Sequence, residues 1–179
     1  MTMFYERGFV GTALADVATD AHVTRGAVYH HFADKKELFE AVMERFEIVA
    51  AERVINAAAE GSDPWDAAIR SLDAFLEQCC DPVYGRIVWK EGPVALGFER
   101  WRECAEIYGF GLTREAVRSL LEAKLVAPAP LETMTRLVYA MIGEAGLALS
   151  QADEAEKAAL RDEFRAVMVR MLEGLRITK

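Results

Sequence analysis

Apolar residues recur along most of this chain at spacings of three and four, and few windows alternate between apolar and polar positions. An example follows Asp34, where one side of a helix would carry Leu38, Val42, Phe46 and Val49. Such spacing gathers side chains on one face of an α-helix, whereas alternation gathers them on one face of a strand. The pattern therefore predicts an all-α fold.

Helix starts are predicted from capping residues. Asp34 followed by Glu37 is a capping box, and the helix that it opens is expected to reach about Ala59. Asp63 and Asp81, each followed by proline, predict two further starts, because aspartate caps a helix well and proline suits its first turn.

Interruptions are expected where glycine or proline breaks the apolar pattern. One break is predicted at Gly92-Pro93, and another turn is predicted between Gly109 and Gly111. Near the N-terminus, Thr12 is expected to cap a short helix.

Two long helices are predicted at the C-terminal end, over about 131–150 and 153–177. The second opens with a capping box formed by Asp153 and Glu156. The first is apolar around most of its circumference, which is typical of a helix buried on more than one side, in a bundle or between subunits.

Composition narrows the classes of function. The chain has 179 residues, of which 53% are hydrophobic, enough for one large domain or two small ones. Its formal net charge is −8, so a nucleic acid must be bound through a local basic patch. The most apolar stretch, 137–149, is too short and too polar to span a bilayer, and no leader pattern precedes it. A cytoplasmic protein without a membrane partner is expected.

No catalytic, phosphate-binding or metal-binding motif is recognisable in the chain. Cys79, Cys80 and Cys104 fit neither a disulfide framework nor a metal site, and they are interpreted as reduced thiols. The three histidines lack the four-residue helical spacing and the acidic neighbours of a metal site. An enzyme, a metal and a cofactor are therefore not expected.

The segment Thr12–Phe32 differs from the rest of the chain. It holds two short helices and a turn in about 20 residues, and all three histidines fall within it beside Arg25, with Lys35 and Lys36 just beyond. An acidic protein thus places a local positive face on one small unit. A helix, a tight turn and a second helix form the arrangement that inserts the second helix into the major groove of DNA.

The same region carries a family resemblance. It closely resembles the DNA-binding domain of the TetR family of bacterial transcriptional regulators, with the spacing intact over about 40 residues. The matching stretches are Glu6–Leu14, Asp16–Ala18 and Val23–Phe32, followed by Lys35 and Leu38.

The resemblance implies an architecture and a function. It implies a helix-turn-helix DNA-binding domain over 1–46 and a helical ligand-binding and dimerisation domain over 47–179, whose last two helices form a four-helix bundle with those of a second copy. The expected function is a ligand-responsive regulator, most often a repressor, which binds a palindromic operator as a homodimer and is released by a small molecule.

Nine residues are predicted to contact DNA. Thr12 would offer a hydroxyl at a helix N-terminus, and Gly26 would permit close approach to the groove. Base reading is assigned mainly to His22, Thr24, Arg25 and Ala27, since an arginine can donate two hydrogen bonds to guanine. Positions that contact phosphates in the family are matched here by Tyr29, His30 and Lys35. Tyr29 could instead be a core aromatic residue, and His30 an ordinary surface residue.

A small core is predicted to fix the angle between the two short helices. It would consist of Leu14, Val17, Ala18, Val23, Val28 and Phe32. Gly8 is interpreted as the glycine that ends the first helix.

The first helix is short for this family, because only Met1 to Arg7 precede Gly8. Residues 1–46 carry five Lys and Arg against seven Asp and Glu. A chain shortened at its N-terminus is one hypothesis, which the mass of the native protein would test. A protein-interaction module that has lost DNA binding is the alternative function.

An apolar effector pocket is expected in the larger domain. Its candidate lining residues are Trp65, Phe75, Trp89, Phe98, Trp101, Tyr108, Phe110 and Tyr139, with plain core packing as the alternative for each. Arg102, Glu103 and Glu144 could fix a polar ligand or pair on the surface. The interrupted segment 86–108 could open the pocket or couple it to the DNA-binding domain.

Overall fold

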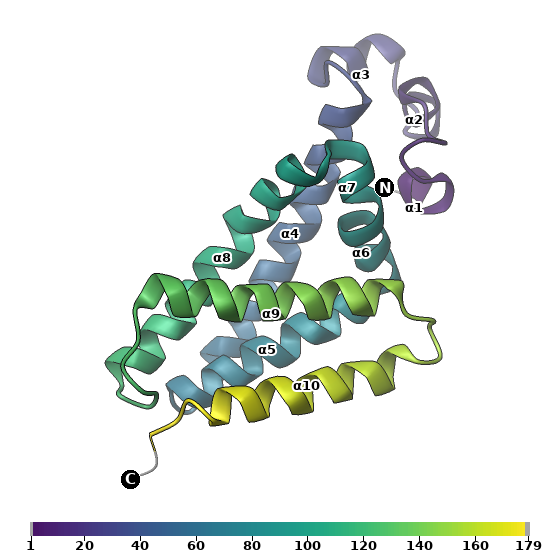
Figure 1. Cartoon of the computed structure of the whole chain (residues 1–179). Coiled ribbons are helices and arrows are strands. Elements are labelled where there is room, and N and C mark those ends of the chain that lie inside the picture. The colour runs from purple at the N-terminus through teal and green to yellow at the C-terminus, as the bar shows by residue number, and fades with distance from the viewer. Residues whose placement is uncertain (1, 178–179) are drawn as a thin grey trace.

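The computed structural model describes residues 2–177, and within them every regular element is a helix (Figure 1), which confirms the all-α prediction. The one strand-like pairing in this range is an isolated bridge between Val126 and Arg176. The elements are α1 (Thr2–Arg7), α2 (Leu14–Asp20), α3 (Arg25–His31), α4 (Lys35–Ala59), α5 (Pro64–Cys80), α6 (Pro82–Tyr84), η1 (Gly85–Glu91), α7 (Gly92–Leu96), α8 (Phe98–Glu122), α9 (Leu131–Gln151) and α10 (Lys157–Glu173). No helix among these residues is long and apolar enough to cross a membrane.

The three aspartate caps lie where the sequence predicts them. Asp34 accepts the Glu37 backbone N–H at 2.9 Å, and α4 ends at Ala59 as expected. Asp63 accepts two backbone N–H groups at the start of α5, and Asp81 accepts two at the start of α6. Each cap satisfies donors that have no partner inside the helix.

The break predicted at Gly92-Pro93 is wrong. The chain continues from η1, a π-helix, into α7 without leaving the helical conformation. Pro93 has no N–H to donate to the preceding turn, and the Val88 carbonyl in that turn accepts the Trp101 indole N–H at 2.7 Å instead. The chain instead bends at Gly97, whose φ of 81° is in the left-handed region that favours glycine.

The turn predicted between Gly109 and Gly111 is also wrong, since both lie inside α8. A Cβ atom at Gly109 would lie 3.1 Å from the Tyr139 ring. The glycine therefore serves the close packing of α8 against α9, which sequence spacing alone does not reveal.

The last helix is shorter than predicted at both ends. It begins at Lys157, because the Glu156 and Lys157 N–H groups bond to the backbone carbonyl of Asp153 and the predicted capping box does not form. It ends at Glu173, and the chain beyond returns to the segment after α8, where the Ala127 N–H donates to the Leu175 carbonyl at 2.9 Å. The two C-terminal helices are thus 131–151 and 157–173.

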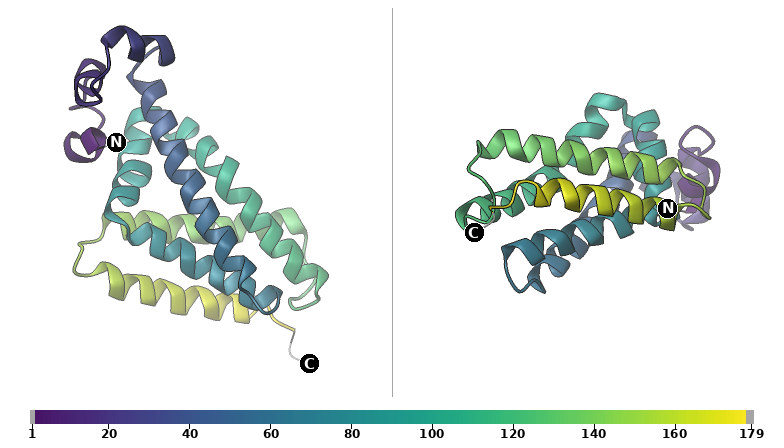
Figure 2. Two further views of the ribbon diagram at one scale, coloured as in Figure 1. Left: turned by 180° about the vertical axis from the view of Figure 1, so that it is seen from behind. Right: turned by 60° about the horizontal axis from the view of Figure 1, so that its bottom comes forward.

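The helix α4 joins the two parts of the molecule. Helices α1, α2 and α3 lie at one end of it, and α5, α9 and α10 lie side by side toward the other end (Figures 1 and 2). The boundary predicted between residues 46 and 47 falls inside this unbroken helix. The division into 1–46 and 47–179 stays a prediction.

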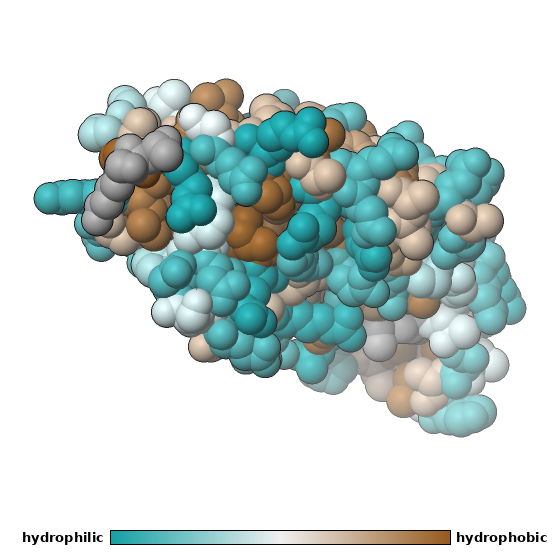
Figure 3. Space-filling model, turned by 90° about the horizontal axis from the view of Figure 1, so that it is seen from below, coloured by the Kyte–Doolittle hydropathy of each residue, from teal (hydrophilic) through white to brown (hydrophobic). Residues whose placement is uncertain are grey.

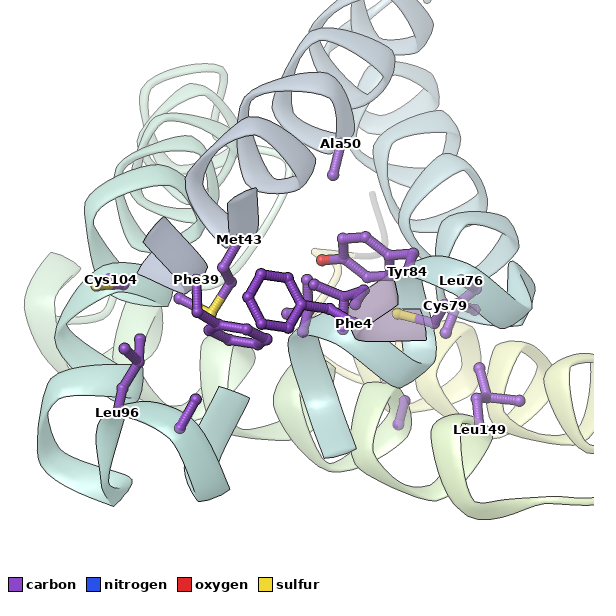
Figure 4. Close-up of a cluster of buried hydrophobic side chains, with 14 of the residues drawn as sticks. Phe4, Phe39, Met43, Ala50, Leu76, Cys79, Tyr84, Leu96, Cys104 and Leu149 are labelled. Atoms are coloured by element: carbon purple, nitrogen blue, oxygen red, sulfur yellow. The ribbon is translucent and has the colours of Figure 1, made fainter. Parts of the chain in front are cut away.

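The main core extends into the first helix. Phe4 of α1 is 2% exposed and meets the Phe39 ring of α4 edge-on at 5.1 Å. Figure 4 shows these side chains near Met43 and Tyr84, in a cluster that reaches Leu149 of α9. The short α1 is therefore packed into the same core as the large helices.

Helices α2 and α3 have a small core of their own. Leu14, Ala18 and Val28 are buried there, and Phe32 packs against them as predicted. Val23 is 47% exposed, so its predicted place in this core is wrong. It lies in the turn, where its backbone N–H bonds to the Ala18 carbonyl and its side chain faces outward.

Candidate DNA-binding surface and effector cavity

The turn between α2 and α3 is fixed by backbone conformation and by a cap. His22 has a φ of 54°, a left-handed conformation that reverses the chain direction. Thr24 is the N-cap of α3, and its hydroxyl oxygen accepts the Ala27 N–H at 3.1 Å. Thr24 thus has a structural role in addition to its predicted DNA contact.

The helix α3 is exposed almost entirely. Within it Val28 is the buried residue, while Arg25, Ala27 and His30 are exposed. Tyr29 is 56% exposed, so it is not a core aromatic residue. Because α3 buries one side chain of seven, most of its surface is left for a partner.

Gly26 has no internal packing reason to be glycine. A Cβ atom there would have one neighbour within 4 Å, the Thr24 hydroxyl oxygen at 3.9 Å, and its φ is not positive. An alanine would cost nothing sterically within the described protein and would favour the helix. Nothing in the described fold therefore requires glycine at this position.

The predicted N-cap role of Thr12 is wrong. Ala13, not Thr12, is the N-cap of α2, and Thr12 is 1% exposed. Its hydroxyl donates to the Gly8 carbonyl at 2.8 Å and lies 3.2 Å from the Met3 carbonyl. Thr12 therefore ties the start of α2 to α1 and has no hydroxyl to offer to a phosphate.

Lys35 is engaged inside the protein. Its ammonium group donates to the Phe9 carbonyl at 2.7 Å and lies 4.3 Å from the centre of the Phe9 ring. These contacts hold the loop after α1 against the start of α4. A lysine ammonium has three N–H donors, so these contacts leave a donor and the charge for a DNA phosphate, and the predicted phosphate contact of Lys35 stays a prediction.

The loop after α1 also contacts η1. The Phe9 N–H donates to the Glu91 carboxylate at 2.7 Å. Gly8 has a φ of 70°, and the same carboxylate lies 2.8 Å from where its Cβ would be. Only glycine meets both demands, and the predicted helix-ending role of Gly8 is confirmed by its conformation.

A cavity of about 960 Å³ lies among α4, α5, α8 and α9. Six of the predicted aromatic residues line it, namely Phe75, Trp89, Phe98, Trp101, Phe110 and Tyr139. Two lie elsewhere. Trp65 packs against the cluster of Val117 and Leu120, and Tyr108 donates to the Glu44 carboxylate at 2.6 Å.

The aromatic walls are held in place by one another. The Trp89 and Trp101 rings meet at 5.6 Å and 70°, and the Trp101 indole N–H donates to the Val88 carbonyl at 2.7 Å. The Phe110 and Tyr139 rings meet edge-on at 5.5 Å. These contacts connect η1, α8 and α9 around the cavity.

The most informative polar residue of the cavity, Glu47 of α4, is absent from the sequence prediction. It is 7% exposed, and burial raises the pKa of its carboxyl group to about 7, although a hydrogen bond with Tyr84 opposes this shift. A signal was available: Met43, Glu47 and Ala50 are spaced by four and three on the buried face of α4. A charged residue on an apolar helix face is unusual.

Of the three charged residues suggested for a polar ligand, Arg102 and Glu144 line the cavity. Arg102 lies 3.4 Å from Glu106. Glu103 pairs with Arg100 at 3.0 Å on the surface, as the alternative interpretation expected.

An exposed helix-turn-helix at one end of a helical body, with an apolar cavity inside that body, defines the class of ligand-binding transcriptional regulators. The family model described as "Bacterial regulatory proteins, tetR family" matches residues 1–42. A second model, "Tetracyclin repressor-like, C-terminal domain", matches residues 65–175. The chain belongs to the TetR family of transcriptional regulators.

Individual relatives agree with this assignment. The chain is 27% identical over 153 residues to the HTH-type transcriptional repressor BepR of Brucella suis, covering 79% of this chain and 72% of BepR. It is 23% identical over 120 residues to the transposon Tn10 TetC protein of Escherichia coli, covering 67% of this chain and 60% of that protein. The crystal structure of a TetR-family regulator from Pectobacterium atrosepticum, 28% identical, superposes with a TM-score of 0.84 over 99% of this chain and 90% of that one.

Proposed function

We propose that this protein is a repressor that binds a palindromic operator as a homodimer and is released from it by a small molecule in the cavity. The observation that carries the proposal is the double role of η1. This one short helix places Trp89 in the cavity wall and Glu91 on the Phe9 N–H of the DNA-binding unit. A ligand that moves η1 would therefore change the cavity wall and the contact with the DNA-binding unit at the same time.

The proposed DNA surface is α3 with the turn before it. Arg25, with His22, Thr24 and Ala27, is proposed to read bases, and Tyr29 and His30 to contact phosphates. Their exposure and the unexplained glycine at position 26 support this assignment. Lys35 is proposed as a further phosphate contact through its remaining N–H, whereas Thr12 is not included because it is buried and its hydroxyl donates within the protein.

The proposed dimer interface is formed by α9 and α10. Their exposed apolar side chains include Leu137 at 69%, Val167 at 55% and Met171 at 58%. Figure 3 views the molecule from below and shows hydrophobic surface among the hydrophilic side chains of that face. A two-fold dimer presents two copies of α3 to half-sites about one turn of DNA, roughly 34 Å, apart.

A salt-series binding titration tests the proposal. The DNA upstream of the coding region is the probe, and a random duplex of equal length is the control. The logarithm of the specific binding constant is expected to fall linearly with the logarithm of the salt concentration, with a slope set by the number of phosphate contacts. Equal affinity for both duplexes would contradict operator binding and favour the protein-interaction module.

A further inference from the structure

The cavity holds one buried carboxylate in apolar surroundings. Glu47 comes from the middle of α4, and the cavity wall around it includes Tyr84 of α6, Trp89 of η1 and Tyr139 of α9. Tyr84 is 1% exposed, and Figure 4 shows its hydroxyl directed toward the interior below α4. A charge in such a place is costly unless an opposite charge or several donors accompany it.

Among the described residues, no basic side chain forms an ion pair with the Glu47 carboxylate. The charge of Glu47 helps to raise the pKa values of four groups: Cys79 of α5, Tyr84, Tyr108 of α8 and Tyr139. Thiols and phenols are neutral near pH 7 even without such a shift, so none of the four supplies a positive charge. Tyrosine hydroxyls can donate hydrogen bonds to Glu47 but cannot neutralise its charge.

Neither arginine of the cavity wall pairs with Glu47. Arg102 pairs with Glu106 at 3.4 Å, and Arg136 lies 5.4 Å from the centre of the Phe110 ring. The remaining charged side chains of the wall are acidic and exposed: Asp63, Glu115 and Glu144. Among the charged residues that line the cavity Glu47 is the buried one, so the interior of the cavity favours a positive ligand.

The aromatic side chains of the cavity wall also favour a positively charged ligand. The faces of tryptophan, tyrosine and phenylalanine rings carry negative partial charge and attract cations within about 6 Å. A volume of about 960 Å³ accommodates a ring-containing body.

We propose that the effector is an organic cation, an ammonium nitrogen on an apolar ring-containing body, with the nitrogen held by Glu47. The inference rests on the proposed function, since it names the chemistry of the ligand that occupies the same cavity.

Three compounds with one naphthalene body test the proposal. Naphthylmethylamine carries an ammonium group, naphthylmethanol a hydroxyl group and naphthoate a carboxylate. Binding to the full chain is measured by isothermal titration calorimetry at about pH 8, where Glu47 is mostly ionised. The amine is expected to bind at least about tenfold more tightly than the alcohol, and the carboxylate most weakly.

Two substitutions test whether Glu47 is the residue that selects the amine over the alcohol. Glu47→Gln keeps the shape of the side chain and is expected to abolish the preference for the amine while the alcohol binds as before. Glu44→Gln is the matched control, because Glu44 is an exposed glutamate one turn earlier on α4 and does not line the cavity. It is expected to leave the preference unchanged. Circular dichroism checks that both variants fold.

Two results would overturn the proposal. The first is an amine that binds no better than the alcohol, or not at all at millimolar concentration. The second is a preference for the amine that persists in Glu47→Gln. A preference for the alcohol that disappears in Trp89→Phe would show that the buried indole N–H of Trp89, which lacks an acceptor among the described residues, selects the ligand instead.

Operator binding with the same compounds separates this inference from the proposed function. If the amine binds selectively but leaves operator affinity unchanged, ligand release is wrong and the cation site stands. If operator affinity falls with the alcohol as much as with the amine, the cation site is wrong and ligand release stands.

Discussion

The DNA-binding unit and the body around the cavity are built on very different amounts of buried surface. Helices α2 and α3 share three buried apolar residues, Leu14, Ala18 and Val28. The body has a core that extends from Phe4 of α1 to Met168 of α10. Because stability follows buried apolar area, the body is the rigid part, and α2 with α3 is a small attachment whose position depends on a few contacts near Phe9.

The largest expected effect comes from the residue where the two regions meet. Phe39 is fully buried between the rings of Phe4 and Phe9. Phe39→Ala is expected to lower the free energy of unfolding by about 3 to 5 kcal/mol, measured by urea denaturation. Val23→Ala, at an exposed position in the turn, is the control and should change it by less than about 0.5 kcal/mol. Similar losses in both variants would mean that the shared core does not hold the regions together.

The second-largest expected effect is a change in stability with pH that arises in the body alone. The pKa of Glu47 is raised from 4.5 to about 7 in the folded state, so its contribution to stability is fully present below 4.5 and is lost as the pH rises through 7. The cost at about pH 8 is about 3 kcal/mol. Glu47→Gln avoids this cost.

The test compares the wild type with Glu47→Gln in urea denaturation at several pH values. The variant should gain stability relative to the wild type as the pH rises from about 5 to about 8. A constant difference between the two proteins over this range would show that Glu47 does not titrate there. Comparison with the variant cancels the titration of groups that both proteins share.

A third effect belongs to the DNA-binding unit alone. Arg25→Ala is expected to weaken operator binding by about 1 to 3 kcal/mol and to relax sequence preference, while binding to random DNA changes little. Tyr29→Phe, which removes a phosphate donor, should weaken both by a similar factor. Equal losses on operator and random DNA for Arg25→Ala would remove this residue from base reading.

The smallest expected effect concerns the link between the regions. Glu91→Ala leaves the Phe9 N–H without its acceptor and should cost about 1 kcal/mol of stability. Its main consequence is expected in the response to ligand: the naphthylmethylamine concentration series should shift operator affinity less than in the wild type. An unchanged shift would place the coupling elsewhere.

Local chemistry explains which features could be predicted from the sequence. The starts at Asp34, Asp63 and Asp81 depend on side chains that bond to the next few residues, so the sequence is enough to find them. The spacing of apolar residues likewise indicates the all-α structure and four members of the small core, Leu14, Ala18, Val28 and Phe32, whereas Val17 and Val23 lie outside that cluster.

Long-range contacts explain which features could not be predicted. Gly109 looks like a turn residue but accommodates the Tyr139 ring from another helix. Thr12 looks like a cap, but its hydroxyl bonds to the carbonyl groups of Gly8, just after α1, and of Met3 within α1. Glu47 can be found from the sequence because it interrupts an apolar helix face. That no cation lies beside it depends on side chains from four other elements, which the sequence does not place.

The length of α4 has a mechanical consequence. Its 25 residues span roughly 37 Å at about 1.5 Å per residue. A rigid rod of that length, tilted by about 5° at the cavity end, moves its far end by about 3 Å. In the proposed dimer both copies of α4 would tilt together. A tilt of a few degrees beside the ligand would therefore displace the two copies of α3 by a distance comparable to the rise of one base pair, about 3.4 Å along the DNA axis.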